Sequence, residues 1–274
     1  FGCKNYWEFR GKYFQSDFQG FTWWLKPKFK PLFKTQLHKD AYILTRKQVG
    51  VANRRVYERR IIEMPNSLRR KYIEMENLFL TSLPSGKEVE TKNVLAQMNF
   101  LSQIAGGFLK GEEFSDFKVK ELISLLEGEL KNEQTVIWTS YLWEVDQIYR
   151  KLLEKKFRVK KIHGDVPIEE RNQSKSLFQS GELDCIVVQV DTWKQGIDLS
   201  NSSTAIYYSN SNSADNRVQS EMRIEKNDKK ETLLYIDLIT ENTIDEDKYK
   251  SLARRKKQSN YFLDILENMK TRRL

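Results

Sequence analysis

The sequence has little that would suit a membrane or an oxidising compartment. No apolar run approaches the roughly 20 residues that a membrane-spanning helix needs, and the first residues contain neither a signal-peptide core nor an initiating Met. Two cysteines are present: Cys3 is near the N-terminus, and Cys185 lies in an apolar run that predicts burial. We therefore expect a soluble chain from a reducing cytosol, and a fragment or processed product of a longer protein.

Acidic residues are fewer than basic ones, since the formal net charge is +9. An excess of positive charge favours a polyanionic partner, although many basic proteins bind no nucleic acid. Between residues 46 and 71, the two acids Glu58 and Glu63 are outnumbered by nine basic residues, which are Arg46, Lys47, Arg54, Arg55, Arg59, Arg60, Arg69, Arg70 and Lys71. This segment is either a surface for a phosphate backbone or a solvated, charge-rich connector.

The pattern of apolar residues divides the chain into two unlike parts. An irregular, aromatic-rich stretch over 6–24 precedes three helical patterns, which cover 67–80, 94–104 and 117–130. From residue 134, strands are predicted over 135–140, 158–162, 184–190, 204–208 and 232–236, and helices over 144–153, 167–178 and 214–225. Right-handed crossovers would build an α/β fold from this alternation, an open parallel sheet with helices on both faces.

These patterns predict three parts of the chain. Residues 1–130 would form a mainly helical region that contains the basic segment, and 131–245 would form the sheet domain. Residues 246–274 would end the chain in a basic docking helix, because apolar residues recur there at helical spacing. Two polar loops, 162–165 and 189–199, follow predicted strands, so they should meet at the carboxyl edge of the sheet, where ligands usually bind.

An ordered series of motifs resembles the second RecA-like lobe of superfamily-two helicases. The segments similar to motifs IV, IVa, V and VI of that lobe are 136–140, 162–165 with Arg171, 195–199 and 217–223. The series looks most like the Swi/Snf-type translocases of double-stranded DNA, particularly their compact bacterial and viral members. Upstream, the stretches that resemble that group's segments between its two lobes are 9–14, 44–49 and 101–108. The resemblance covers nearly the whole chain and implies a RecA-like sheet over 131–245.

The resemblance also implies an ATP site between two lobes. In such motors the first lobe cradles the phosphates and Mg²⁺, and the second supplies arginines to the charge that develops during transfer. Gly196 and Asp198 match motif V, where a small residue admits the nucleotide and a carboxylate reaches the ribose or an arginine. A plain turn with an Asx contact is the alternative for these two residues. Gln219 and Arg223 match motif VI and, four residues apart on a helix, would share one face.

The chain departs from the family pattern at two positions of motif VI. Lys226 stands where a second arginine is usual, and Glu225 stands where a histidine is common. Lysine keeps the charge but lacks the planar fork that holds a phosphate bidentately. We therefore expect either that Arg223 serves as the arginine finger or that hydrolysis is weak. The catalytic candidates are Gln219, Arg223 and Lys226.

No segment has the form G-x-x-x-x-G-K-[ST], which a first lobe needs to bind phosphates. Gly86-Lys87 is followed by Glu88, and residues 245–247, although acidic, follow no apolar strand and indicate a solvated turn. We therefore expect ATP and Mg²⁺ to bind only together with a first lobe, in cis or in trans. The chain alone would be an inactive half of a DNA-dependent ATPase, and no metal ligands are predicted in it.

Contacts to DNA are predicted from the two loops and the basic segment. The candidates, which could meet phosphates through side chains and helix-end amides, are His163, Gly164, Arg171, Thr192, Lys194, Arg46 and Lys47. For His163, a satisfied loop histidine is the alternative. No base-reading motif is visible, which fits sequence-independent binding of double-stranded DNA. Trp138 is expected in the core, whereas Trp193 is left open between core packing and stacking.

Two functions stay open at this point. The chain is either the C-terminal motor lobe of an ATP-dependent double-stranded DNA translocase, or a non-catalytic DNA- or protein-binding adaptor derived from such a lobe. Motif V and the first half of motif VI favour the motor, whereas Glu225 and Lys226 favour the adaptor. A methyltransferase-like domain is disfavoured, because no Gly-rich fingerprint follows the first strand of the alternating half. Either function fits the cytoplasm of a bacterial or virus-infected cell, with the nucleoid as a compatible place.

Overall fold

The computed structural model describes residues 2–16, 23–33, 35, 55–195, 197–225, 231–253 and 265. The chain divides into two compact units, Phe1–Ala52 and Asn53–Leu274, which are described separately. The predicted C-terminal docking helix lies mostly outside the described residues, as do the predicted site residues Arg46, Lys47, Gly196 and Lys226. The side chains of Trp193 and Lys194 also lie outside them.

The first unit contains a short helix and a small hairpin rather than irregular chain. Its elements are α1 (Tyr6–Tyr13), β1 (Phe14–Ser16), β2 (Trp23–Leu25) and η1 (Pro27–Phe29). Asn5 begins the helix because its side chain accepts a hydrogen bond from the backbone N–H of Glu8. Buried Tyr13 makes ring contacts with Phe9, Phe29 and Phe33. The irregular structure expected over 6–24 is thus wrong for the described part, since a cap and an aromatic cluster order it.

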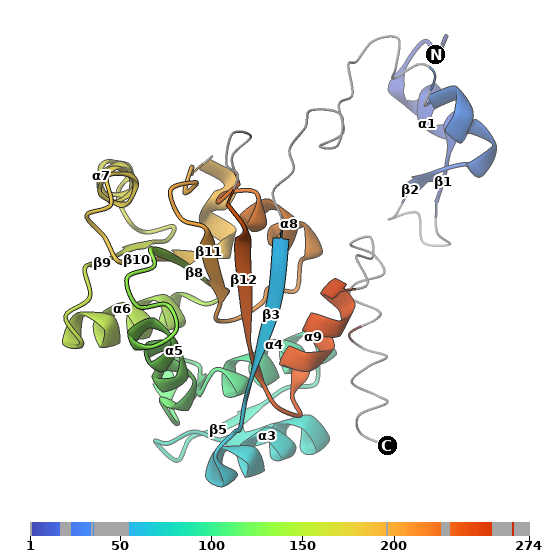
Figure 1. Cartoon of the computed structure of the whole chain (residues 1–274). Helices are drawn as coiled ribbons and strands as arrows, with labels where there is room; N and C mark the ends of the chain where they lie inside the picture. Colours follow the sequence, from blue (N-terminus) through green and yellow to red (C-terminus); the bar gives the residue numbers. More distant parts are fainter. Residues whose placement is uncertain are drawn as a thin grey trace. The chain divides into compact units, whose positions relative to one another are not determined.

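A six-stranded, fully parallel sheet forms the centre of the second unit (Figure 1). Its strands, in spatial order, are β3 (Arg55–Ile62), β12 (Leu233–Thr240), β11 (Thr204–Tyr207), β8 (Thr135–Thr139), β10 (Cys185–Gln189) and β9 (Val159–Ile162). Val136 of β8 pairs with Ile186 on one side and Ala205 on the other, which sets the register of the central strands. The α/β fold and the five predicted strands are confirmed.

The sixth strand, β3, corrects the expected boundary of the sheet. All eight of its residues pair in parallel with β12, so the sheet uses residues upstream of 131. The connector interpretation is therefore wrong for 55–62. Residues 55–62 lack the regular alternation of apolar and polar residues that predicts a strand. An edge strand nevertheless tolerates exposed charge, and Arg60 forms an ion pair with Glu129. Further along the basic segment, Arg69 donates hydrogen bonds to the backbone oxygens of Glu241 and Asn242.

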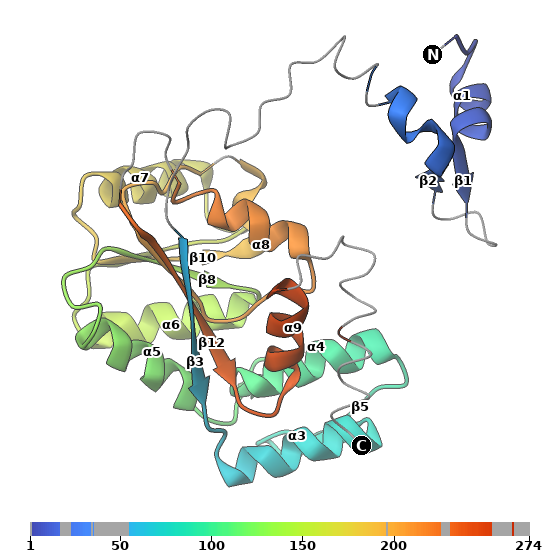
Figure 2. The ribbon, with the colours of Figure 1, turned by 45° about the vertical axis from the view of Figure 1, so that its right-hand side comes forward.

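Helices cover both faces of the sheet, as Figure 2 shows. On one face lie α5 (Phe117–Glu127) and α6 (Leu142–Glu154), and on the other lie α7 (Ile168–Gln179) and α8 (Ala214–Glu221). Side chains alternate between the two faces along each strand, so Ile137 joins one core and Trp138 joins the other. Trp138 is fully buried, which confirms its predicted place in the core.

A third group of elements packs beyond the carboxyl ends of β3 and β12 (Figure 2). It comprises α3 (Asn66–Leu78), β4 (Leu80–Ser82), β5 (Glu88–Glu90), α4 (Val94–Ala105), β6 (Phe108–Leu109), β7 (Glu112–Glu113) and α9 (Ile244–Ala253). Its core includes Tyr72, Met98 and Ile244. Gly107, which joins α4 to β6, has a φ of +92°, and a Cβ there would lie 2.1 Å from the backbone oxygen of Ser115.

The acidic residues 245–247 do not form a solvated turn. They occupy the first turn of α9, where Asp245 and Asp247 are buried. The ammonium of Lys118 lies 2.6 Å from a carboxylate oxygen of Asp245, and this pairing makes burial of the charge tolerable. The expectation of a solvated turn was wrong because the partner lysine lies more than a hundred residues upstream. Within the described part of the chain, no helix is long and apolar enough to cross a membrane.

Candidate functional site

The carboxyl edge of the sheet brings together the loops that the sequence singles out. The loop after β9 carries His163 and Gly164, and the loop after β10 begins as the short helix η2 (Val190–Gln195). Helix α8, which follows β11, carries Gln219. Because all the strands are parallel, these segments leave the sheet in the same direction, as predicted for a ligand-binding edge.

The segments that resemble motifs V and VI are directly connected. The backbone N–H of Leu199 donates to the backbone oxygen of Arg223 at 3.0 Å. The side-chain amide of Asn216 donates to the carboxylate of Asp191 at 2.9 Å. These two bonds tie the loop after β10 to α8 and to the turn beyond it, so a displacement of one segment would disturb the other.

Asp198 is exposed and makes the Asx contact that the alternative interpretation expected. Its Oδ1 accepts a hydrogen bond from the backbone N–H of Ser200 at 3.0 Å. The amide of Gln179 lies 3.4 Å from its other carboxylate oxygen. The carboxylate thus shapes its own turn, and a contact with nucleotide stays a prediction.

Gln219 and Arg223 do not share a helical face. Helix α8 ends at Glu221, short of the predicted 225, and Arg223 lies in the following turn with its N–H donating to the oxygen of Ser220. The chain leaves the helix there because Ile224 is fully buried in the core beside the sheet. Both side chains are half-buried, and their roles in catalysis and nucleotide binding stay predictions.

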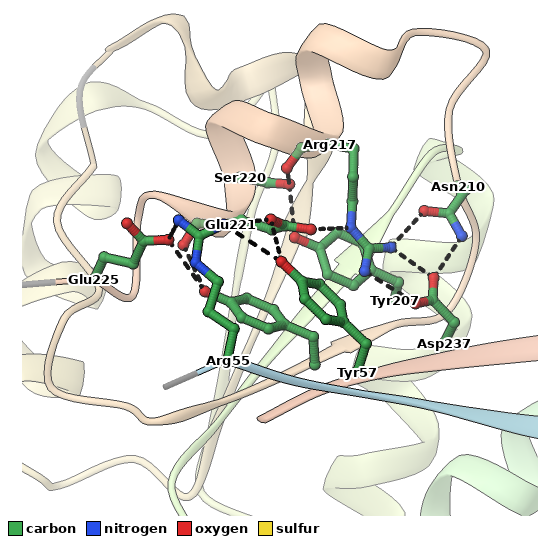
Figure 3. Close-up of polar contacts among 10 residues, drawn as sticks. Arg55, Tyr57, Tyr207, Asn210, Arg217, Ser220, Glu221, Glu225 and Asp237 are labelled. Carbon is green, nitrogen blue, oxygen red and sulfur yellow. Dashed lines mark hydrogen bonds and ion pairs between the residues drawn. The ribbon is translucent and has the colours of Figure 1, made fainter. Parts of the chain in front are cut away.

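A buried network centred on Arg217 lies beneath this turn, and sequence reasoning gave it no role (Figure 3). The guanidinium binds the carboxylate of Asp237 through two nitrogens, at 2.6 and 2.9 Å, and that of Glu221 at 2.8 Å. It also lies 3.4 Å from the centroid of the Tyr207 ring. Burial opposes the charge, but Asp237 and the other partners hold the pKa of Arg217 well above its ordinary value.

The network continues to strand β3 through Arg55 and Tyr57. The hydroxyl of Tyr57 donates to Glu221 at 3.0 Å, and Arg55 pairs with both Glu221 and Glu225. Two features of the sequence indicate part of this network. Arg217 and Glu221 are four residues apart, and Asp237 interrupts an apolar strand. The partners from β3 could not be foreseen, because that strand was not recognised.

The loop after β9 is braced from within. Arg171 on α7 donates through Nη2 to the backbone oxygen of Gly164 at 2.9 Å and through Nε to that of Val166. The side chain therefore holds the loop, in addition to any contact with a ligand. The prediction that Arg171 meets a phosphate is not tested by this geometry.

His163 and Thr192 are buried at the same edge. One ring nitrogen of His163 accepts a hydrogen bond from the N–H of Asp165 at 3.3 Å, which agrees with the satisfied-loop alternative. Among the described residues, the other ring nitrogen and the hydroxyl of Thr192 have no hydrogen-bond partner. Burial, with a smaller contribution from Lys161, lowers the pKa of His163, so the ring is neutral near neutral pH. A contact of either residue with nucleic acid stays a prediction.

Comparison with known proteins finds a similarity to helicases over part of the chain. Residues 117–227 match the family model of the helicase conserved C-terminal domain. The ATP-dependent RNA helicase FAL1 of Kluyveromyces lactis is 34% identical over 96 residues, which are 35% of this chain and 24% of that protein. The pre-mRNA-splicing ATP-dependent RNA helicase PRP28 of the same organism is 29% identical over 126 residues, with 39% and 23% covered. The chain thus spans about a quarter of the length of these relatives.

Two solved structures share the fold. The C-terminal part of the Fun30 ATPase domain superposes with a TM-score of 0.55 at 11% identity, covering 71% of this chain and 88% of that one. The SWI2/SNF2 ATPase C-terminal domain of Sulfolobus solfataricus gives 0.52 at 21% identity, covering 73% and 85%. The expected bacterial or viral type gains no support from these proteins. Residues 117–227 are therefore similar to the helicase conserved C-terminal domain, in a chain whose fold is similar to the C-terminal parts of the Fun30 and the Sulfolobus solfataricus SWI2/SNF2 ATPases.

Proposed function

We propose that this chain is the second RecA-like lobe of an ATP-dependent motor that moves on nucleic acid. The observation that carries the proposal is the direct bond between the segments that resemble motifs V and VI, from Leu199 to Arg223, within a matched helicase C-terminal domain. In such a lobe, one loop faces nucleic acid and the next faces nucleotide, so a physical link between them couples binding to hydrolysis. FAL1 and PRP28 are named as ATP-dependent RNA helicases, which agrees with this proposal.

In this proposal, Arg223 and Gln219 face the phosphates of an ATP that a first lobe holds. The first lobe also supplies the Mg²⁺ ligands, because this sequence contains no phosphate loop. Bound ATP and its metal supply the γ-phosphoryl group and partial neutralisation of its charge. The guanidinium of Arg223 adds positive charge to the transferring group, and Asp198 orients the loop beside it.

We propose double-stranded DNA as the track. The fold is similar to SWI2/SNF2 ATPase lobes, and the sequences of the loops after β9 and β10 contain no base-reading motif. RNA is the second candidate, because FAL1 and PRP28 are named as RNA helicases. His163, Gly164, Thr192 and Lys194 would contact phosphates in either case.

The test is ATP hydrolysis by a protein that contains this chain together with a first lobe. We expect double-stranded DNA to stimulate hydrolysis more than duplex RNA does, and the affinity to fall steeply with salt, as phosphate contacts require. Stronger stimulation by RNA would assign the second track. Salt-dependent binding without stimulated hydrolysis would show that the chain is a non-catalytic adaptor, which would overturn the motor.

Replacement of Lys226 by Arg tests the departure from motif VI. Arginine restores the planar fork, so we expect Lys226→Arg to raise kcat about tenfold or more in the two-lobed protein. Lys250→Arg, at an exposed position of α9, is the matched control and should leave kcat unchanged. Equal kcat for Lys226→Arg and the unchanged protein would show that Lys226 does not weaken hydrolysis.

A further inference from the structure

We propose that Arg55, on edge strand β3, is a positioning residue for Arg223. Arg55 pairs with Glu221, which precedes the turn that carries Arg223, and with Glu225, which follows it (Figure 3). A single guanidinium thus connects the two ends of the turn. The inference rests on the proposed function only for the role of Arg223, because the connection itself is a property of the fold.

The contacts of Arg55 hold its guanidinium in one place. Its Nη1 lies 3.3 Å from Glu221 Oε2, and its Nη2 forms the ion pair with Glu225. The same Nη1 also lies 3.3 Å from the hydroxyl of Tyr57. The side chain is 22% exposed, and the carboxylates of Glu221 and Glu225 are 10% and 8% exposed. Pairs at this level of burial are screened less by water and salt than surface pairs, so they hold geometry better.

Two tyrosines support the same arrangement. The rings of Tyr57 and Tyr235 stack with their centroids 5.2 Å apart, and this contact joins β3 to β12. The hydroxyl of Tyr235 donates to the backbone oxygen of Glu221 at 3.1 Å and lies 3.5 Å from Glu225. Arg217 holds Glu221 from the other side at 2.8 Å. The end of α8 is therefore fixed by side chains from two strands, β3 and β12, and by Arg217 of the helix itself.

The rest of the turn is fixed by its backbone and by burial. The oxygen of Arg223 accepts the bond from Leu199, and the side chain of Ile224 is fully buried. Once both flanking acids are held, the backbone of Arg223 has little freedom, so the direction in which its side chain leaves the turn is set. Ordering of this kind lowers the entropy that a catalytic arginine must lose when it meets a phosphate.

The ion pair with Arg55 offers a structural explanation for the glutamate at position 225. Motif VI commonly has a histidine at this position in the family that the sequence resembles, and Glu225 first indicated a loss of function. The structure instead shows a carboxylate that pairs with Arg55, which lies beside the first residue of β12. Burial raises the pKa of Glu225, and Arg55 opposes that shift. The departure from the family pattern at Glu225 therefore coincides with a local ion pair in this chain.

The first experiment measures the connection in the full chain by amide hydrogen exchange. We expect Arg55→Gln to speed exchange at least tenfold for the amides of 221–225 and of Leu199, with little change in α6. Arg59→Gln, which removes the same charge from an exposed position of β3, is the matched control and should exchange like the unchanged protein. Glu225→Gln should also speed exchange in 221–225. If Arg55→Gln does not unfold cooperatively, and so is not properly folded, the result for Glu225→Gln decides whether the ion pair orders the turn. Unchanged exchange in 221–225 would overturn the proposal.

The second experiment measures the consequence in the two-lobed protein. We expect Arg55→Gln to lower kcat at least tenfold while the KM for nucleic acid stays within twofold, and Arg55→Lys, which lacks the fork, to restore less than half of the lost rate. Equal kcat in Arg55→Gln and Arg59→Gln would overturn positioning. If the unchanged protein shows no stimulated hydrolysis, the proposed function fails, and the exchange experiment still decides whether Arg55 orders the turn.

Discussion

At the scale of single residues, buried charge is tolerated here where several partners surround it. The guanidinium of Arg217 is surrounded by the carboxylates of Glu221 and Asp237 and by the amide of Asn210. The loss of either carboxylate would leave charge in the interior without its full compensation. Glu144, at the start of α6, is also buried, but it has neutral partners instead. It accepts hydrogen bonds from the hydroxyl of Ser209 and the backbone N–H of Tyr141.

The difference between these two residues predicts a pH dependence of stability. Burial is the main cause that raises the pKa of Glu144 from 4.5 to about 7, and Ser209 and Lys118 oppose it. Between these values the folded chain keeps the proton that the unfolded chain releases, so this contribution to stability is present at low pH and is lost as the pH rises through 7. We expect Glu144→Gln to remove up to about 3 kcal/mol of this dependence.

Chemical denaturation at several pH values from 5 to 8 measures the effect. The free energy of unfolding of the unchanged chain should fall relative to that of Glu144→Gln as the pH rises. Glu169→Gln, at an exposed position of α7, should follow the unchanged chain. Parallel profiles for all three chains would show that Glu144 is not held protonated.

The residues of the site were only partly predictable from sequence. Motif spacing placed the loops of His163 and Thr192 at the carboxyl edge of the sheet, and the parallel strands β9 and β10 do lead into both loops there. The network around Arg217 could not be predicted, because its members come from β3, β11, α8 and β12, and no local pattern reports which distant side chains meet. Which of these side chains meet depends on the order of the strands in the sheet, and the periodicity of the sequence does not show that order.

At the scale of elements, sequence patterns located strands that are buried on both faces and missed the one at the edge. Strands β8, β10 and β11 are apolar runs whose ends the patterns predicted to within about two residues. Strand β3 mixes apolar residues with four charged ones, and its pairing partner β12 is distant in the chain. Helix α8 was predicted too long, because helical periodicity continues to Ile224 even though the backbone turns before it.

The joint between α4 and β6 gives a prediction at this scale. Gly107 has a positive φ, and a Cβ there would lie 2.1 Å from the backbone oxygen of Ser115, which cannot move without displacing the start of α5. Gly111 has a similar φ of +86° but open space around it. We expect Gly107→Ala to destabilise the chain by about 3 kcal/mol or more, and Gly111→Ala by about 1 kcal/mol, the cost of left-handed backbone alone.

Thermal and urea unfolding of both glycine variants measure this difference. The comparison isolates the steric contact, because both substitutions add the same methyl group at a similar backbone angle. Equal losses of stability in the two variants would show that the turn at Gly107 relaxes at little cost.

At the scale of the whole molecule, the chain divides into two units that are stabilised separately. All three hydrophobic clusters of the described residues contain only residues from Ile62 onward. The aromatic contacts of Tyr13 lie within the first unit. Sequence composition did not reveal this division, because the basic segment runs across the boundary at residue 52 and gives no break in pattern.

Removal of the first unit tests the division. We expect a chain of residues 53–274 to unfold cooperatively with a Tm within about 3 °C of the second unit's transition in the full chain, since its cores are intact. Circular dichroism and calorimetry of the two chains provide the comparison. Loss of a cooperative transition in the shorter chain would show that the first unit is required for the fold.

The pairing of β3 with β12 has a consequence for synthesis on the ribosome. Roughly 170 residues separate Ile62 from Leu233, so at typical elongation rates β3 emerges about 10 to 30 seconds before its partner. During that interval the apolar residues Val56, Ile61 and Ile62 have no strand to pair with. Newly made chains should therefore be most prone to aggregate before translation of β12, and slower elongation should lengthen that period of risk.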